Sequence, residues 1–432
     1  MKNYILLFIV IFQISLLKAQ NQSDIRKIIP NLVKTYKYLH QHPELSFKEL
    51  KTAAFLSKKM KLYGFDVTEN VGKTGVVAIL KNGNGPKILI RTDTDALPVL
   101  EKTGVDFASK VRQIDIEGIE RPVMHACGHD IHMSVWLGTA KYLSEHKNEW
   151  KGTIMMIAQP AEERGGGSLA MLNDGLYQRF FVPDYGLALH INSNLPAGKI
   201  SYCSGYSMAN VDMIKIKLFG KGGHGAYPHT TIDPIAMGSQ LVVGLQNIVS
   251  REVSPLDPAV VTVGLFQAGT KGNIISSEAK LELTVRTYKD EVRKKVLDAI
   301  IRKTIAIAKS FGVTKENYPT IEFRKNYTPA LYNNPVLVDK VILNFQKIFG
   351  AQNILKSDPV MGGEDFSRYG KTKEKVPIFM FSLGVVNIDK YNKFTKENKQ
   401  LPSLHSDLMM PDPVPSITTG ITAMINAVKS LQ

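Results

Sequence analysis

The sequence has little cysteine, which excludes a fold built on disulfides. Its 432 residues include two cysteines, Cys127 and Cys203, so one bridge is the most it can form. A chain of this length buries enough surface to form its core without cross-links. With 44% hydrophobic and 22% charged residues, the composition is globular and excludes a disordered or collagen-like chain. At about 100–200 residues per domain, we expect two or three domains.

Long apolar runs and nucleic-acid-binding motifs are also missing. Beyond the first 20 residues, no apolar run approaches the roughly 20 residues that a membrane helix needs. Lys and Arg outnumber Asp and Glu by 54 to 39, but no basic run is interleaved with aromatic residues. We therefore interpret the excess as charge scattered over the surface and expect no nucleic-acid partner. The same positive field would attract anionic substrates.

The N-terminal segment has the pattern of a secretory signal peptide. A short basic start precedes the 13 residues from Ile5 to Leu17, which are apolar except for Gln13 and Ser15. This run is too short to span a bilayer and is typical of a signal-peptide core. Cleavage after Ala19 would remove residues 1–19, with an uncleaved anchor as the alternative. We expect an exported protein, periplasmic or secreted, with no stable membrane span after cleavage.

Two architectures follow one another along the chain. From residue 25 to 200, apolar runs of strand character alternate with helical patterns, which predicts an α/β sheet covered on both faces. From about residue 210 to 327, the expected order is β-α-β-β-α-β, as in a ferredoxin-like module. From residue 329 the alternation of strand and helix patterns returns. We therefore expect a catalytic domain at residues 24–205 and 329–432, interrupted by a small domain at residues 206–328.

The densest group of possible metal ligands is the segment 124–132, Met-His-Ala-Cys-Gly-His-Asp-Ile-His. Cys127 and His129 flank a glycine, so both can reach one site from a turn, and thiolate and imidazole are strong ligands for zinc-like ions. His132 lies farther along the expected helix and is interpreted as a structural or supporting residue. A helix N-terminus with incidental polar residues is the alternative for this segment.

Further candidates stand where predicted strands end. Ligands of α/β sheets bind beyond the carboxyl ends of the strands, and these ends carry acids and a histidine: Asp93, Asp95, Glu162, Glu163 and His190. Two adjacent acidic residues at the end of a buried strand cost free energy unless they form ion pairs or bind a cation. A lone histidine, such as His405 in its polar loop, is more often a hydrogen-bonded bystander. Cys, His and Glu from separate strand ends nevertheless predict a metal site together.

Six motifs occur in an order that resembles the M20 metallopeptidase family. They are 91–98 (RTDTDALP), 124–130 (MHACGHD), 159–163 (QPAEE), 222–229 (GGHGAYPH), 362–366 (GGEDF) and 404–406 (LHS). The resemblance is to the amidohydrolase branch, which includes hippurate hydrolases, N-acyl-amino-acid deacylases and auxin-conjugate hydrolases. It implies an α/β fold, with a mixed-sheet catalytic domain of the metallo-exopeptidase type and an inserted ferredoxin-like domain.

The resemblance also implies roles for particular residues. It implies two divalent transition-metal ions, manganese or zinc, with cobalt and nickel as alternatives, held by Cys127, His129, Glu163, His190 and His405. Glu162 matches the family's catalytic carboxylate, and Asp95 matches the acid that orients a ligand from behind. In the inserted domain, His224 matches a histidine that reaches the active site of the facing subunit of a dimer. Asn273 and Arg286 match positions that hold the substrate carboxylate.

From these observations we expect an exported amidohydrolase that cleaves N-acyl amino acids to a carboxylic acid and an amino acid. Glu162 would take a proton from the attacking water and pass it to the leaving amine. A metallo-carboxypeptidase or dipeptidase on the same scaffold is one alternative, and a protein that binds acyl amino acids without turnover is another. The inserted domain is expected to act as a lid and to form a homodimer, or only to oligomerise.

Two further details bear on these expectations. Cys127 must be a thiolate to bind metal, so we do not expect it to form a bridge with Cys203, which is expected to pack. Ser193, Ser276 and Asp407 stand where family members often have proline. These departures affect the expected substrate preference more than catalysis.

Overall fold

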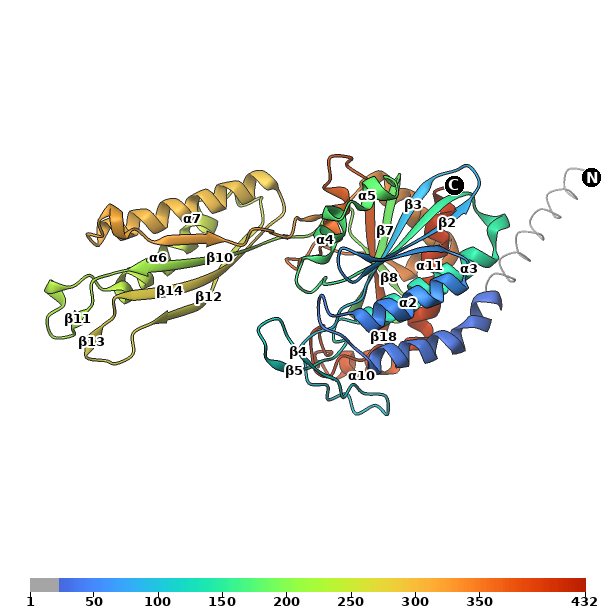
Figure 1. Ribbon diagram of the computed structural model, residues 1–432, viewed down its shortest axis with the longest axis horizontal. Coiled ribbons are helices and arrows are strands. Elements are labelled where there is room, and N and C mark those ends of the chain that lie inside the picture. The colour runs from blue at the N-terminus through green and yellow to red at the C-terminus, as the bar shows by residue number, and fades with distance from the viewer. Residues whose placement is uncertain (1–22) are drawn as a thin grey trace, which may run out of the picture. The chain divides into compact units, whose positions relative to one another are not determined.

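The computed structural model describes residues 23–432, so the predicted signal peptide at 1–19 lies outside the described residues. The chain forms two compact units (Figure 1). The first contains the chain through Gly205, Tyr332–Asp358 and Arg368–Gln432. The second contains Tyr206–Leu331 together with Pro359–Ser367, a stretch that the sequence-based division assigned to the catalytic domain. Between residues 23 and 432 we find no helix with the length and apolar character needed to cross a membrane.

An eight-stranded mixed sheet forms the centre of the first unit, in the order β1-β2-β6-β3-β7-β18-β8-β17. The strands are β1 (Asp66–Val71), β2 (Gly75–Asn82), β3 (Lys87–Asp93), β6 (Gly152–Gln159), β7 (Tyr185–Pro196), β8 (Ile200–Tyr202), β17 (Ile354–Lys356) and β18 (Ile378–Val386). The central strands β6, β3, β7 and β18 are parallel to one another. Their nearly continuous apolar runs reflect burial on both faces, which confirms the predicted α/β sheet.

Helices pack against this sheet and form one large core with it. The described part of the first unit has a helical stretch at 23–41 and the helices α2 (Leu50–Leu62), α3 (His129–Glu145), α4 (Gly167–Asn173), α5 (Leu176–Arg179), α8 (Pro335–Phe349), α9 (Ser367–Gly370), α10 (Ile388–Lys396) and α11 (Pro413–Ser430). α3 and α11 approach closely because of two glycines. A Cβ on Gly138 would lie 2.3 Å from Ile421 Cδ1, and one on Gly420 would lie 2.6 Å from Val135 Cγ2. α3, which carries part of the site, is therefore fixed within the core.

The second unit is a four-stranded antiparallel sheet in the order β12-β14-β10-β15. Its elements follow the chain as β10 (Asn210–Phe219), α6 (Pro234–Asn247), β12 (Ala259–Ala268), β14 (Glu278–Thr287), α7 (Asp290–Ser310) and β15 (Thr320–Phe323). This is the predicted β-α-β-β-α-β order, with a small additional pair formed by β11 (Gly223–His224) and β13 (Ile274–Ile275).

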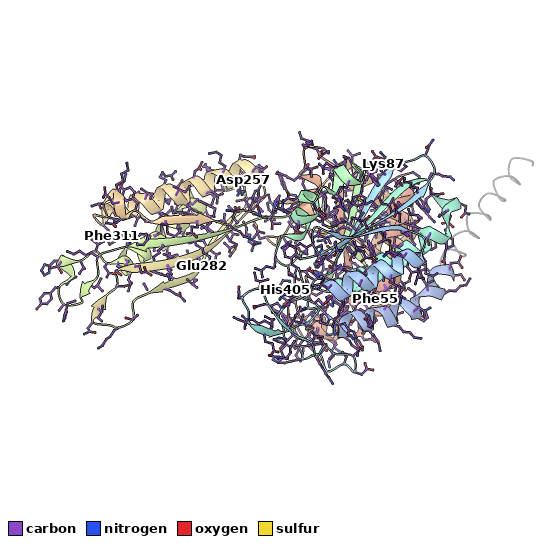
Figure 2. The ribbon with its side chains drawn as sticks, viewed as in Figure 1. Phe55, Lys87, Asp257, Glu282, Phe311 and His405 are labelled. Carbon is purple, nitrogen blue, oxygen red and sulfur yellow. The ribbon has the colours of Figure 1, made fainter. Side chains whose placement is uncertain are left out.

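One face of this smaller sheet packs on its helices and the other carries charges. Alternate residues of β10 and β14 are buried, and they share a core with α6 and α7. On the opposite face, Lys215 pairs with Glu282 at 3.4 Å and Lys217 pairs with Glu278 at 2.6 Å. Glu282 is labelled in Figure 2. The alternation of apolar and polar residues is typical of a sheet that has one face packed on a core and the other exposed to solvent.

Candidate metal centre

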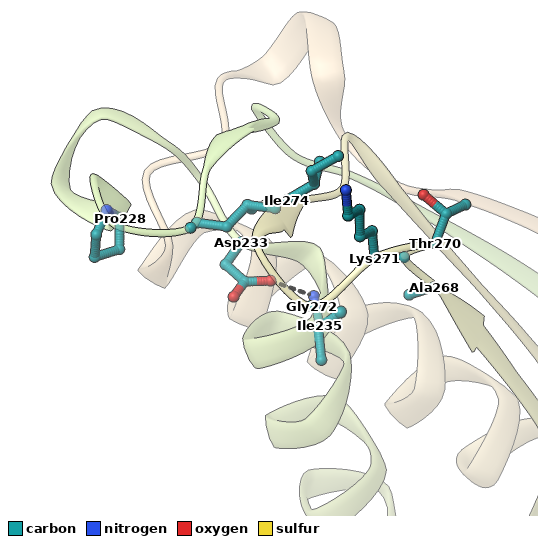
Figure 3. Close-up of a pocket in the computed structure, with 11 residues that line it drawn as sticks. Pro228, Asp233, Ile235, Ala268, Thr270, Lys271, Gly272 and Ile274 are labelled. Carbon is teal, nitrogen blue, oxygen red and sulfur yellow. Dashed lines mark hydrogen bonds between the residues drawn. The ribbon is translucent and has the colours of Figure 1, made fainter.

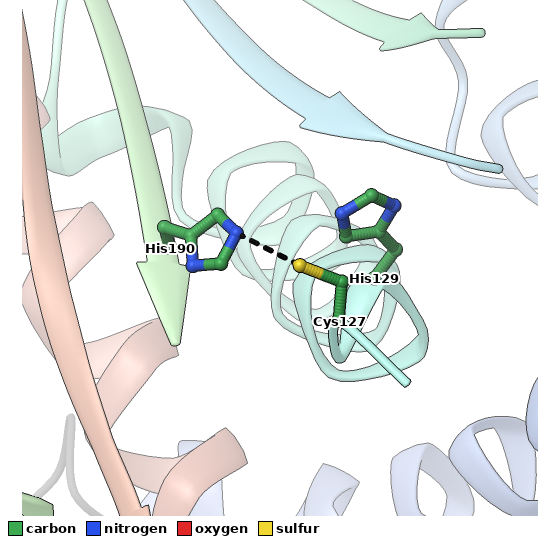
Figure 4. Close-up of side chains that lie close together, drawn as sticks. All are labelled: Cys127, His129 and His190. Atoms are coloured by element: carbon green, nitrogen blue, oxygen red, sulfur yellow. Dashed lines mark hydrogen bonds between the residues drawn. The ribbon is translucent and has the colours of Figure 1, made fainter. Parts of the chain in front are cut away.

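The five predicted ligands lie together in the first unit. Sγ of Cys127 is 3.5 Å from Nε2 of His190 (Figure 4). The carboxylate of Glu163 lies 3.5 Å from Nε2 of His405 and 3.8 Å from Nε2 of His129. Donor atoms of Cys127, His129 and His190 lie within 4.8 Å of one another, as do those of Cys127, Glu163 and His405. The predicted residues therefore form one connected cluster of sulfur, nitrogen and oxygen donors.

A glycine places the first two of these residues. Gly128 has φ +76° and precedes α3, and a Cβ there would lie 2.2 Å from Cδ1 of Ile191. The left-handed conformation and the close approach both require glycine. The turn at this residue brings Cys127 and His129 to the same cluster from the beginning of α3.

His190 reaches the cluster from β7, although not at the strand's end, as the sequence suggested. β7 continues to Pro196 because it pairs with β18 over that length. Its pairing with β3 ends at Ala188, which lies opposite Arg91. His190 therefore lies beyond the part of the strand that β3 covers.

Asp95 connects the two glutamates with His129. Its carboxylate accepts hydrogen bonds from the backbone N–H of Glu162 at 3.0 Å and of Glu163 at 3.1 Å, and from the hydroxyl of Ser46 at 2.6 Å. Its backbone carbonyl accepts a hydrogen bond from Nδ1 of His129 at 2.7 Å. The proton of His129 is thereby assigned to Nδ1, which turns Nε2 toward the other donors.

His132 is excluded as a further ligand because both of its ring nitrogens are engaged. Nδ1 donates to Oδ1 of Asp93 at 2.6 Å, and Nε2 accepts the backbone N–H of Ile191 at 2.9 Å. Burial lowers the pKa of His132 to about 4 despite the nearby Asp93, in keeping with a neutral ring. Asp93 itself is fixed by Arg91, whose Nη1 donates to it at 2.7 Å. His132 thus ties α3 to β7 and supports the site.

The electrostatics of the cluster favour a bound cation. Burial disfavours a charged His129, but Asp93, Asp95 and Glu163 outweigh burial and raise its pKa to about 10. Burial, assisted by the charges of Glu163 and Glu162, raises the pKa of the Cys127 thiol well above its usual value. Burial is also the main cause that raises the pKa of Glu163 to about 7. These shifts are those of a site with excess negative charge, and a metal ion would reverse them.

The donor set also fits divalent metal ions. Among residues 23–432, Nε2 of His129 and Oε1 of Glu163 are buried side-chain atoms without a hydrogen-bond partner. Buried polar atoms are almost always paired, so a role as metal ligands would account for both atoms. Glu162 lies beside them, with a carboxylate oxygen within 4.8 Å of His129 and Glu163.

The three site residues predicted in the second unit do not all lie close together. His224 on β11 and Asn273 lie close together, since the carbonyl of Asn273 accepts the N–H of Gly225 at 2.9 Å. Arg286 is opposite Val211 at the start of β10, whereas β11 follows the end of β10. Arg286 therefore lies at the other end of this sheet, where its Nε donates to Thr284 at 3.1 Å.

The second unit has a cavity of about 600 Å³ near the pair formed by β11 and β13 (Figure 3). Gly225 and Ile274, which follow His224 and Asn273 in the chain, are among the residues that line it. Asp233 also lines the cavity, but its carboxylate caps α6 by accepting the N–H of Ile235 at 2.8 Å. The second unit thus has a hollow lined by the chain neighbours of two of its predicted functional residues.

The sequence analysis missed several residues that support the site. One is Ser46, whose hydroxyl donates to Asp95; it lies shortly before α2, which begins at Leu50. A buried set formed by His40, Asp130 and Glu101 was also missed. Its members are far apart in the sequence and share no local motif. A single sequence therefore carries no signal that would group them.

Comparison with known proteins agrees with this geometry. A hippurate hydrolase of Campylobacter jejuni is 39% identical over 348 residues, covering 79% of this chain and 85% of the relative. A thermostable carboxypeptidase 2 of Saccharolobus solfataricus is 36% identical over 370 residues, covering 85% and 88%. The crystal structure of YxeP from Bacillus subtilis, described as a dinuclear metal-binding peptidase, matches with a TM-score of 0.74 at 30% identity, covering 94% of this chain and 99% of that one.

The mixed sheet, the donor cluster and these relatives define a metal-dependent amidohydrolase. The sequence pattern of peptidase family M20/M25/M40 matches residues 89–406, and the chain belongs to this family.

Proposed function

We propose that this protein is exported and hydrolyses N-acyl amino acids to a carboxylic acid and an amino acid, with two divalent transition-metal ions. The observation that carries the proposal is the donor cluster with Glu162 beside it. The hippurate hydrolase of C. jejuni supports the substrate class, since hippurate is N-benzoylglycine. The dinuclear description of YxeP supports the number of ions.

Five residues would hold the ions: Cys127, His129, Glu163, His190 and His405. Cys127, His129 and Glu163 each belong to more than one group of neighbouring donors, so the cluster would offer donors to more than one ion. The mixture of thiolate, imidazole and carboxylate suits zinc or manganese, with cobalt and nickel as alternatives. Such ions would lower the pKa of a coordinated water and polarise the amide carbonyl.

Glu162 acts as the general base and then as the general acid. Its carboxylate takes the proton of the attacking water and delivers it to the leaving amine nitrogen, which must be protonated to depart. Asp95 does not take part in this transfer, because its carboxylate accepts the backbone N–H groups of Glu162 and Glu163. Asp95 instead positions both glutamates and, through its carbonyl, His129.

The second unit would bind substrate and form a homodimer. His224 would stabilise the developing oxyanion in the facing subunit, and Asn273 and Arg286 would hold the substrate carboxylate. β12 is an edge strand of its sheet, with Thr262 and Phe266 exposed, and such an edge can pair with a second copy. Sedimentation should show a dimer, and a monomer at micromolar concentration would contradict this assignment.

A comparison of substrates tests the proposed reaction. Metal-loaded protein is given N-benzoylglycine, several N-acetyl amino acids and a set of dipeptides, and the released amino acid is measured. We expect the acyl amino acids to be cleaved with the higher kcat/KM. Cleavage of dipeptides alone would favour a carboxypeptidase or dipeptidase, for which the S. solfataricus relative is the supporting observation. Binding of acyl amino acids without product would favour a binding protein.

Export is tested by the N-terminus of the mature protein. Cleavage after Ala19 predicts that the exported protein begins at Gln20. Intact Met1 on the protein recovered from cells would contradict the signal peptide, and membrane-bound protein with an intact N-terminus would indicate an anchor.

A further inference from the structure

The buried carboxylate of Glu49 has no role in the site described so far. Glu49 is fully buried and directly precedes α2, at the position where a side-chain oxygen ordinarily caps a helix. Glu44 caps this helix instead: its carboxylate accepts the N–H of Lys51 at 3.2 Å and that of Thr52 at 2.8 Å. Glu49 makes no side-chain hydrogen bond to the helix that it precedes.

The carboxylate of Glu49 turns instead toward the segment that carries the two glutamates of the site. Its Oε1 accepts the backbone N–H of Ala161 at 2.8 Å and that of Phe47 at 2.9 Å. Its Oε2 accepts the hydroxyl of Thr74 at 2.6 Å. Three donors from three separate segments thus converge on one buried side chain.

Ala161 is the residue at which this segment turns. It has φ +49°, a left-handed conformation that alanine seldom adopts, and its carbonyl accepts the N–H groups of Gly166 and Gly167, each at 3.2 Å. The next two backbone N–H groups, those of Glu162 and Glu163, are bound by Asp95. Three consecutive amides are therefore held by two buried carboxylates, one of them Glu49.

We propose that Glu49 is a positioning residue for Glu162: by binding the Ala161 amide it holds the left-handed turn that directs Glu162 and Glu163 to different tasks. The proposal rests on the proposed function in that it takes Glu162 to be the base. Loss of the hydrogen bond would allow Ala161 to relax toward an ordinary conformation. Glu162 would then shift from the reacting water, while the metal ions would keep Glu163 in place.

The role requires hydrogen-bond acceptors rather than charge. Burial and the negative charge of Asp95 raise the pKa of Glu49 to about 7, so a neutral side chain is tolerated there. Glutamine offers an oxygen to Ala161 and Phe47, and its amide N–H can donate to the Thr74 hydroxyl, which accepts as well as donates. Glu49→Gln should therefore restore what Glu49→Ala loses.

The test compares four proteins: wild type, Glu49→Ala, Glu49→Gln and Glu44→Ala, which removes the cap of the same helix and touches no part of the turn. The measurements are kcat and KM for N-benzoylglycine, metal content, thermal unfolding, and hydrogen–deuterium exchange of the amides at 161–163. We expect Glu49→Ala to lower kcat about 10- to 100-fold, with little change in KM or metal content and with faster exchange at the turn. Glu49→Gln should stay within a few-fold of wild type, and Glu44→Ala should lower Tm alone.

Three results would overturn the proposal. These are wild-type exchange and kcat in Glu49→Ala, equal losses of kcat in Glu49→Ala and Glu44→Ala, and equal impairment by the alanine and glutamine substitutions. If Glu49→Ala does not fold, Thr74→Val removes one of the three hydrogen bonds, and unchanged exchange at 161–163 in that variant would also contradict the role. If wild type hydrolyses no acyl amino acid, the proposed function fails, while the exchange comparison still decides whether Glu49 holds the turn.

Discussion

Nδ1 of His129 donates its hydrogen bond to the backbone carbonyl of Asp95, at 2.7 Å, while the nearer carboxylate oxygen lies at 3.5 Å. The ring is therefore oriented by the main chain of residue 95, and the side chain of the same residue is left to bind the amides of Glu162 and Glu163. Since the two tasks belong to different atoms, a substitution of the side chain can separate them.

Asp95→Asn is expected to lower activity without removing the metal ions. One carboxylate oxygen becomes an amide nitrogen, which cannot accept a hydrogen bond from a backbone N–H, so at least one of the two glutamates loses its support. His129 keeps its acceptor because the carbonyl is unchanged. We expect kcat to fall about 100-fold, as for a misplaced catalytic group, with metal content near that of wild type. Loss of metal along with activity would show that the carboxylate itself orients His129.

Glu162→Gln is expected to lower kcat about 10²- to 10⁴-fold, the range for loss of a general base. Glutamine has nearly the same shape but cannot accept the proton of the attacking water. Metal content should remain near normal, because Glu162 is not among the proposed ligands. Elemental analysis of the purified variant checks this point, and depletion of metal would mean that Glu162 and Glu163 have exchanged roles.

Cys127→Ser is expected to deplete the metal, because a serine hydroxyl is a much weaker ligand than a thiolate for ions of this class. Cys203→Ser is the matched control, since both cysteines are buried and free of disulfides and Cys203 lies outside the donor cluster. Metal content should fall in the first variant and stay at the wild-type value in the second. An unchanged metal-to-protein ratio in Cys127→Ser would remove this residue from the site.

The buried His40 should make stability depend on pH. Its Nδ1 lies 2.6 Å from Asp130 and its Nε2 3.0 Å from Glu101, and although burial opposes the charged form, these hydrogen bonds raise the pKa of His40 from 6.5 to about 9. A raised pKa stabilises the fold fully below pH 6.5, and this contribution is lost as pH rises through about 9. A shift of this size corresponds to about 3 kcal/mol.

Thermal unfolding of metal-loaded wild type and His40→Asn between pH 6.5 and pH 9.5 measures this contribution. The difference in Tm should be largest at the lower pH and shrink toward the higher one. His42→Asn, a change at an exposed histidine nearby, serves as the control and should show a small difference at every pH. A difference for His40→Asn that does not change with pH would show that the ring is not charged in the native protein.

The strands of the first unit could be predicted because they have a local signature, and the structure brings the predicted donor residues together. The apolar runs became strands such as β6, which is mostly buried, and β3, in which every residue except Lys87 is buried. The extent of β7 could not be predicted, because its last residues depend on β18, nearly 200 positions later in the chain. The strand's own composition gave no indication of this partner.

The supporting residues escaped prediction for a related reason. Glu49 binds an amide 112 residues away, and His40 binds an aspartate 90 residues away. Such pairs depend on the folded arrangement, whereas Cys127 and His129 are close in sequence and of types that bind metal. Glu49 also stands at the position of a helix cap. Only the structure shows that Glu44 caps α2 and that the carboxylate of Glu49 binds elsewhere.

The metal-to-protein ratio of the wild-type chain tests the central claim most directly. Purified protein is loaded with manganese or zinc, freed of loose ions by gel filtration, and measured by elemental analysis together with its protein concentration. The proposed site for two ions in the donor cluster predicts a ratio of two ions for each chain. A ratio near zero, or one that stays at a single ion when metal is in excess, would contradict it.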